Sequence, residues 1–198
     1  LSIHSFPTRR SSDLDLEAGG TWLGIGADGR FAALTNIRNP NQPLGRRSRG
    51  ELVAQFLCGE QSMEDYLAEV VGRSDEYAGF NLLLGNAEAL YYLSAVNPHP
   101  QRLEEGVYGV SNASLDTPWP KLLKAKAALV AQLDDPQPSG LLTLLRDPAT
   151  APFAELPDTG VGLATESLLS SVFIASPSYG TRASSALIVN ADGSRHFV

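Results

Sequence analysis

The sequence predicts an α+β fold in which helices cover the faces of antiparallel sheets. Three pairs of apolar segments, each joined by a short turn rich in Asn, Asp or Gly, indicate β-hairpins. Segments with a helical spacing of apolar residues lie between these pairs. Hairpins that are close in sequence imply antiparallel pairing, because parallel strands need long crossover connections.

The three hairpins follow the same pattern along the chain. Their paired segments are 22–25 with 31–34, 80–84 with 90–93, and 186–189 with 196–198. The first and third turns contain Asp-Gly, and glycine supplies the positive φ that tight hairpin turns require. Two further segments, 107–111 and 172–176, have the composition of strands.

Two helices are expected between the first and second hairpins. Residues 48–51 read Ser-Arg-Gly-Glu, a capping box that opens a helix containing Cys58. Ser62 is the expected cap of a second helix over 63–71. We expect Cys58 to be a small buried residue of the first helix.

Two more helices are expected before the third hairpin. The longest spans 118–133, with an apolar stripe formed by Leu122, Leu123, Ala127, Val130 and Leu133. Lys121 is expected to face outward from it. A shorter helix covers 139–145, and the stretch 147–162, which carries three prolines and two glycines, is expected to be a loop.

The composition of the 198-residue chain is that of a globular protein with one domain, or two small ones. Hydrophobic residues make up 43% and charged residues 19%, which is enough apolar mass for a core. The formal net charge of −7 argues against a nucleic-acid partner. No apolar run reaches the roughly 18 residues of a membrane-spanning helix, so integral membrane association is not expected. With one cysteine and three dispersed histidines, we expect no metal and no cofactor, and the cytoplasm is the simplest location.

The first residues of the chain differ from the rest. Residues 1–14 read LSIHSFPTRRSSDL, a segment rich in serine and arginine that lacks the apolar core of a signal peptide. Regular alternation of apolar and polar residues starts at Asp15. We therefore expect 1–14 to be a non-native or disordered leader and 15–198 to be a single incomplete domain, truncated at both ends.

A series of short strings in fixed order resembles one protein family. They are GGTWLG at 19–24, ALTN at 33–36, RGELV at 49–53, GFNL at 79–82, YGVSNA at 108–113, TPWPK at 117–121 and YGTR at 179–182. Each string is weak alone, but the ordered set resembles the NRDE family, also called the transport and Golgi organisation protein family. The resemblance runs from Glu17 to the end of the chain.

The resemblance implies a four-layer αββα sandwich similar to that of N-terminal-nucleophile hydrolases. Family members usually begin with Met-Cys and carry Asn-Arg-Asp-Glu soon after, and neither string is present here. In such hydrolases the N-terminal thiolate attacks an amide carbonyl and the α-amine of the chain accepts the proton. Cys58 cannot replace that nucleophile because it has no free α-amine. We therefore expect an amidohydrolase in an intact parent protein and no catalysis by this chain.

The resemblance also implies a set of site residues. Asn36 and Asn112 would lie around the nucleophile, one to bind the oxyanion and one for orientation, and Arg182 would lower the pKa of the nucleophilic thiol by its positive charge. The candidate ligand-binding residues are Trp22, Arg38 and Tyr179. Plainer interpretations stay open: asparagines at strand ends, a tryptophan in packing contacts and an arginine on an exposed loop.

A different interpretation is a non-enzymatic carrier or trafficking factor. The family is implicated in secretory organisation, mitochondrial metabolism and haem mobilisation, and this interpretation keeps the pocket but uses it to hold an apolar ligand with a carboxylate. The expected partner is therefore a small-molecule amide, acyl or haem-like ligand, and the oligomeric state stays open. A third interpretation is an inactive fragment with exposed strand edges.

Overall fold

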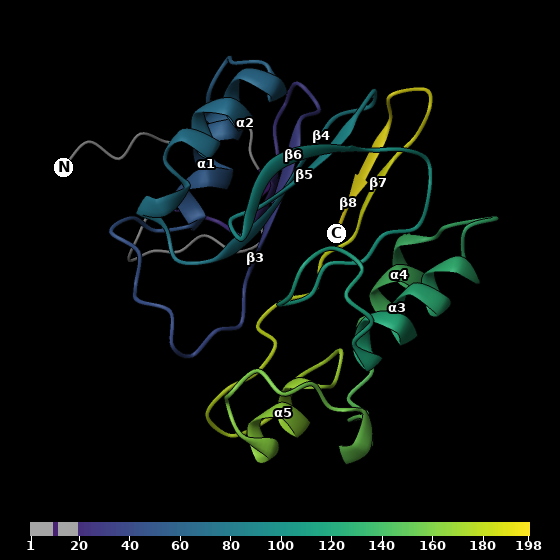
Figure 1. Cartoon of the computed structure of the whole chain (residues 1–198). Helices are drawn as coiled ribbons and strands as arrows, with labels where there is room; N and C mark the ends of the chain where they lie inside the picture. Colours follow the sequence, from purple (N-terminus) through teal and green to yellow (C-terminus); the bar gives the residue numbers. More distant parts are fainter. Residues whose placement is uncertain (1–9, 12–19) are drawn as a thin grey trace. The chain divides into compact units, whose positions relative to one another are not determined.

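The computed structural model describes residues 10–11 and 20–198, and the chain divides into two compact units (Figure 1). The first unit comprises residues 1–36 and 43–104, and the second comprises 37–42 and 105–198. Most of the predicted leader, 1–14, lies outside the described residues. The predicted domain boundary at residue 14 therefore stays a prediction.

The first unit contains an antiparallel sheet whose six strands lie side by side in chain order. The strands are β1 (Arg10–Ser11), β2 (Leu23–Ile25), β3 (Phe31–Asn36), β4 (Phe80–Gly85), β5 (Leu90–Ser94) and β6 (Asn97–Leu103). The first two predicted hairpins are confirmed as β2–β3 and β4–β5. The central pair β3–β4 joins segments that are far apart in the sequence, with Leu34 opposite Leu82.

Strand β6 is not predicted by the sequence, because Pro98 and Pro100 lie within it. It lies at the end of the strand order and pairs with β5. An edge strand tolerates proline, because an N–H that faces away from the sheet has no partner in the ladder. Prolines on such an edge also hinder pairing with a strand of another chain.

Helices α1 (Gly50–Cys58) and α2 (Met63–Gly72) lie on the same side of this sheet (Figure 1). They are followed by a short 3-10 helix, η1 (Ser74–Glu76). The core forms where both helices meet the sheet, and its fully buried side chains include Leu52, Val53, Phe56, Tyr66, Leu67, Phe80, Leu82 and Leu84. Tyr66 also donates a hydrogen bond from Oη to the carbonyl of Leu52 at 2.7 Å, which ties α2 to α1.

One of the two predicted helix caps is confirmed. Ser62 Oγ accepts a hydrogen bond from the backbone N–H of Asp65 at 3.0 Å, as expected for the N-cap of α2. The capping box predicted for α1 is wrong, since no side chain caps that helix. The Glu51 carboxylate instead accepts a hydrogen bond from Tyr77 Oη and pairs with Arg47, each at 2.5 Å. These tertiary contacts draw the carboxylate away from the first turn.

The second unit contains three α-helices, a short 3-10 helix and a hairpin. They are α3 (Pro120–Val130), α4 (Pro138–Leu144), η2 (Phe153–Glu155), α5 (Leu163–Leu169), β7 (Leu187–Val189) and β8 (Arg195–Phe197). The third predicted hairpin is confirmed as β7–β8, and α3 and α4 correspond to the two predicted helices. Helix α5 was not predicted.

The two additional strands predicted in this unit are wrong. In 107–111, Gly109 donates its N–H to the Asp116 carboxylate and accepts a hydrogen bond from the Asp116 N–H, so a local turn uses its backbone groups. In 172–176, the isolated bridge between Ala175 and Gly180 closes a tight turn. Most residues of both segments are partly buried, and a strand pattern alone cannot distinguish partly buried loops from paired strands.

Antiparallel strands with separate helices make the fold α+β, as predicted. The four-layer αββα arrangement stays a prediction. Cys58, predicted to be buried, is exposed at the C-terminal end of α1, because the last position of the helix points away from the core. Among the helices of the described residues, none combines the length and apolar character of a membrane span.

Candidate functional site

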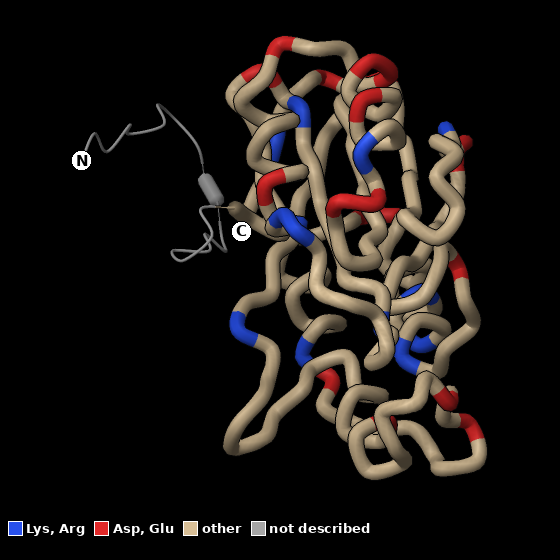
Figure 2. The backbone as a smooth tube through the Cα atoms, turned by 60° about the vertical axis from the view of Figure 1, so that its left-hand side comes forward, with Lys and Arg blue, Asp and Glu red and all other residues tan. Residues whose placement is uncertain are grey.

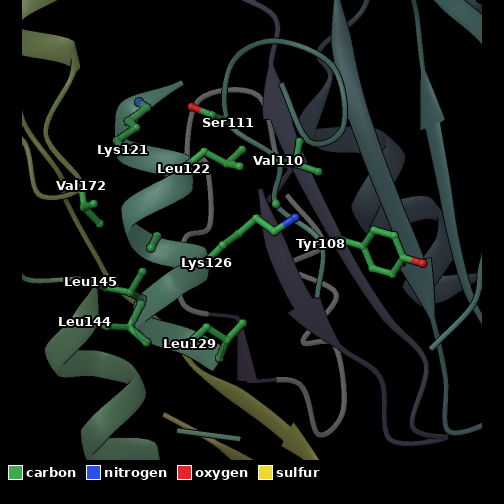
Figure 3. A pocket seen from close by; sticks show the side chains of 12 residues that line it. Tyr108, Val110, Ser111, Lys121, Leu122, Lys126, Leu129, Leu144, Leu145 and Val172 are labelled. Atoms are coloured by element: carbon green, nitrogen blue, oxygen red, sulfur yellow. The ribbon is translucent and has the colours of Figure 1, made fainter. Parts of the chain in front are cut away.

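A cavity of about 330 Å³ lies in the second unit, along one side of α3. Its lining is mostly aliphatic and consists of Tyr108, Gly109, Val110, Ser111, Lys121, Leu122, Ala125, Lys126, Leu129, Leu144, Leu145 and Val172. In Figure 3, Lys121 and Ser111 are drawn toward one end of α3, and Leu129, Leu144 and Leu145 toward the other. The cavity therefore has an apolar wall and a few polar groups, which is typical of small-molecule sites.

The orientation predicted for α3 is wrong. Of the expected apolar stripe only Leu122 is buried, while Leu123 and Val130 are more than half exposed. The side that lines the cavity contains Leu122, Ala125 and Leu129 instead, together with Lys121, which was expected to face outward. Both sides of this helix carry apolar residues at helical spacing, so the pattern alone could not select the inner one.

Lys121 is the most unusual ionisable group of the second unit. Its pKa is lowered to about 8, mainly by burial of the ammonium group and further by the charge of Arg38, while the Glu166 carboxylate partly offsets both effects. No described residue forms an ion pair with Lys121, whereas Lys124 pairs with Asp147. An unpaired amine in an apolar wall can either bind an anion or act as a neutral base or nucleophile.

Arg38 and Glu166 form a buried ion pair beside Lys121. Arg38 Nη1 lies 2.5 Å from Glu166 Oε2, and the two side chains are 9% and 2% exposed. The other carboxylate oxygen accepts hydrogen bonds from the N–H and hydroxyl of Thr159 at 2.8 and 2.6 Å. The Arg38 guanidinium also stacks on Trp119, 4.7 Å from the ring centroid.

The predicted site residues fall in both units. Arg38 and Asn112 lie together in the second unit, where the Arg38 N–H donates to the Asn112 carbonyl at 2.7 Å. Tyr179 is 60% exposed on a turn closed by Ser176, and Arg182 is exposed just after it.

Asn36 and Trp22 belong to the first unit. Asn36 ends β3, and Trp22, which precedes β2, is 38% exposed. The common pocket of Asn36, Asn112 and Arg182 stays a prediction.

The guanidinium group of Arg38 is already engaged by Glu166 and Trp119, which favours a role in positioning rather than ligand binding. Sequence reasoning did not identify Lys121 or Glu166 as functional candidates. Lys121 lies in the TPWPK string but resembles a solvated lysine, and Glu166 lies in a helix that was not predicted. Only the folded arrangement shows that both are withdrawn from solvent.

Basic and acidic residues are both distributed along the described chain (Figure 2). The arginines that precede α1 illustrate this mixture: Arg47 pairs with Glu51 at 2.5 Å and Glu76 at 3.1 Å, and Arg49 donates to the Gly79 carbonyl at 3.1 Å. The guanidinium groups of Arg47 and Arg49 are therefore already bound to acceptors within the protein, which disfavours these arginines as a site for an external anion. In the described part of the chain, no group of three or more His, Cys, Asp or Glu could hold a metal ion.

Comparisons with known proteins give a consistent result. The family model described as Transport and Golgi organisation 2 matches residues 10–198. The Transport and Golgi organization protein 2 homologs of Bos taurus and Homo sapiens are each 36% identical to the chain, over 92% of its length and 73% of theirs. Transport and Golgi organization protein 2 of Drosophila melanogaster is 27% identical, over 93% of this chain and 74% of its own.

Proposed function

Because the chain belongs to the Transport and Golgi organisation 2 family, we propose that it acts as a carrier for an apolar small molecule with a carboxylate, such as an acyl or lipid-like ligand. The observation that supports this proposal is the cavity along α3, with its aliphatic wall and the Lys121 amine. A carrier needs a pocket that excludes water from an apolar chain and one group that fixes its polar end.

The binding free energy of such a ligand would come from two parts of the cavity lining, the aliphatic wall and the Lys121 amine. Each square ångström of acyl chain removed from water contributes roughly 25 cal/mol. At neutral pH the Lys121 ammonium is mostly protonated, because its pKa is about 8. A ligand carboxylate would pair with this charge and offset the unfavourable burial that lowers the pKa. Lys124 and Lys126 are less suited, since Asp147 and Asp116 already pair with them.

Calorimetric titration with octanoate tests this proposal, with octanol as the uncharged ligand of equal chain length. We expect saturable binding of octanoate, weaker binding of octanol, and a loss of about tenfold in octanoate affinity in Lys121→Met, which corresponds to about 1.4 kcal/mol. Lys124→Met is the matched control, because it removes an exposed lysine of the same helix. Octanoate that does not bind saturably, or binds equally to both variants, contradicts the proposal. Haem, titrated in the same way, tests whether a larger carboxylate is also accepted.

A second candidate is an N-terminal-cysteine amidohydrolase in an intact parent protein. Asn36, Asn112 and Arg182 would have the supporting roles described above. One contact favours it: Arg38, two residues after Asn36, is hydrogen-bonded through its backbone N–H to the Asn112 carbonyl. This contact keeps the chain that follows Asn36 against the segment that carries Asn112.

Hydrolysis assays on the intact parent distinguish the two candidates. A hydrolase releases an amine from simple amides, loses that activity when its N-terminal cysteine is changed to alanine, and is slowed about 100-fold or more in the counterpart of Asn112→Ala. A carrier binds octanoate and releases no amine. A parent without cysteine after the initiator methionine excludes the hydrolase.

A further inference from the structure

The chain has three lysines, and all of them lie in α3. They nevertheless have different surroundings. Lys124 pairs with Asp147, and Lys126 pairs with Asp116 at 2.7 Å. Lys121 has no such partner among the described residues and lines two cavities, of about 330 and 320 Å³, on either side of the start of the helix. One amine of the three therefore combines an apolar setting with freedom from an ion pair.

We propose that Lys121 is a covalent attachment site for aldehydes that carry an apolar chain, which it captures as an imine from the cavity along α3. The inference rests on the proposed function, because the cavity that accepts an acyl chain must also accept the chain of the aldehyde. It adds a distinct chemistry, since a carrier of carboxylates needs a charged amine and imine formation needs a neutral one.

The reaction balances without any further reactant. The lone pair of Lys121 Nζ attacks the carbonyl carbon, and a C–N bond forms as the C=O π bond breaks. Proton transfer from nitrogen to oxygen gives a carbinolamine. The hydroxyl then leaves, the second N–H proton is lost with it, and the products are the imine and one water molecule. No oxidant, reductant or metal is involved.

The surroundings of Lys121 favour its neutral amine. Burial and the positive charge of Arg38 hold its pKa near 8, against 10.5 for an ordinary lysine. At neutral pH this difference makes the free amine roughly 300-fold more abundant than on an unperturbed lysine. The Arg38 charge is kept in place by its 2.5 Å contact with Glu166, whose carboxylate raises the pKa of Lys121 and partly offsets the effect of Arg38.

Lys124 and Lys126 differ from Lys121 because each has a carboxylate partner, although Lys126 lines the same cavity. Lys124 is engaged by Asp147 and Lys126 by Asp116, and an amine held in an ion pair must leave its carboxylate before it can attack a carbonyl. Lys124 is also largely exposed, with 57% of its side chain accessible, and it does not line the cavity along α3. Both therefore serve as internal controls within one helix.

Reductive trapping tests the inference. The protein is incubated with octanal and cyanoborohydride, which reduces the imine to a stable secondary amine, and the modified peptides are identified by mass spectrometry. We expect Lys121 to be modified at least about tenfold faster than Lys124 and Lys126, with a rate that rises as the pH passes through about 8. Acetaldehyde, which lacks an apolar chain, should show a smaller preference for Lys121.

Two variants make the result decisive. Lys121→Arg keeps the positive charge but cannot form an imine, so the rapid labelling should disappear, while Lys124→Arg should leave it unchanged. Equal labelling of the three lysines, or preferred labelling of Lys124, would overturn the inference. If octanoate binds but octanal does not label Lys121 preferentially, the covalent site fails while the carrier proposal stands; if octanoate does not bind, the carrier proposal itself fails.

Discussion

The guanidinium of Arg38 and the carboxylate of Glu166 form an ion pair 2.5 Å long although 128 positions separate them in the sequence. Both side chains are almost completely buried, and Thr159 and Trp119 provide further contacts for the two charges. The pair attaches the short segment 37–42 to α5 in the second unit. Ion pairs this deeply buried stabilise a protein only when their remaining polar atoms are also satisfied.

Removal of one partner of this pair should destabilise the second unit strongly. Glu166→Gln keeps the shape of the side chain but leaves the Arg38 charge buried without compensation, so we expect a loss of about 3–5 kcal/mol in the free energy of unfolding. Urea denaturation followed by tryptophan fluorescence measures this change. Glu155→Gln, on the exposed turn η2, is the control and should have almost no effect. A double variant, Arg38→Met with Glu166→Leu, should recover much of the loss, because neither charge is then buried alone.

The stability of the protein should depend on pH through Lys121. Its pKa is lowered from 10.5 to about 8 on folding, so the unfolded chain binds the proton more tightly between these values. The free energy of unfolding therefore gains a contribution that increases from about pH 8 to about pH 10.5 and is constant outside that interval. Lys121→Met should remove this increase and stabilise the protein at neutral pH, whereas Lys124→Met should retain it. If the unfolding free energies of the wild type and Lys121→Met depend on pH in the same way between pH 8 and pH 10.5, the lowered pKa does not belong to Lys121.

Two glycines of the first unit should respond oppositely to alanine. A methyl group on Gly45 would collide with the backbone of Tyr77 and Ala78, and backbone atoms cannot move aside as a flexible side chain can. We expect Gly45→Ala to lower the unfolding free energy by about 1–3 kcal/mol. At Gly72, the last residue of α2, nothing lies within 4 Å of the added methyl group, so Gly72→Ala should raise it by about 0.5–1 kcal/mol. In thermal unfolding, the melting temperature should fall in Gly45→Ala and rise in Gly72→Ala relative to the wild type.

The two serines at helix starts provide a test of side-chain capping. Ser62→Ala removes the acceptor for the Asp65 N–H and should cost about 1 kcal/mol of unfolding free energy. Ser48→Ala should have little effect, because no side chain caps α1. A comparable loss in both variants would mean that α1 also depends on a serine cap in solution.

Local signals predicted the hairpins reliably. Asp28-Gly29 and Asp192-Gly193 join β2 to β3 and β7 to β8, and the turn conformation depends on a few adjacent residues, with φ of +91° at Gly29 and +81° at Gly193. The cap of α2 was predictable for the same reason, since Ser62 and Asp65 are three residues apart.

Predictions that depended on distant partners failed. The capping box of α1 failed because Tyr77 and Arg47 compete for the Glu51 carboxylate. Strand β6 was missed because its prolines are tolerated only at an edge, and strand order is a property of the assembled sheet. The inward side of α3 was misassigned because either side of the helix could have been buried.

The sequence alone predicted the α+β class, the three antiparallel hairpins and membership of the family. These features depend on residues adjacent in the chain or on strings in fixed order. Only the tertiary structure decided that Arg38 pairs with Glu166 and that Lys121 is withdrawn from water beside them. The physical reason is that desolvation and charge–charge interactions depend on which side chains surround a group. Those neighbours come from segments that the sequence does not place together.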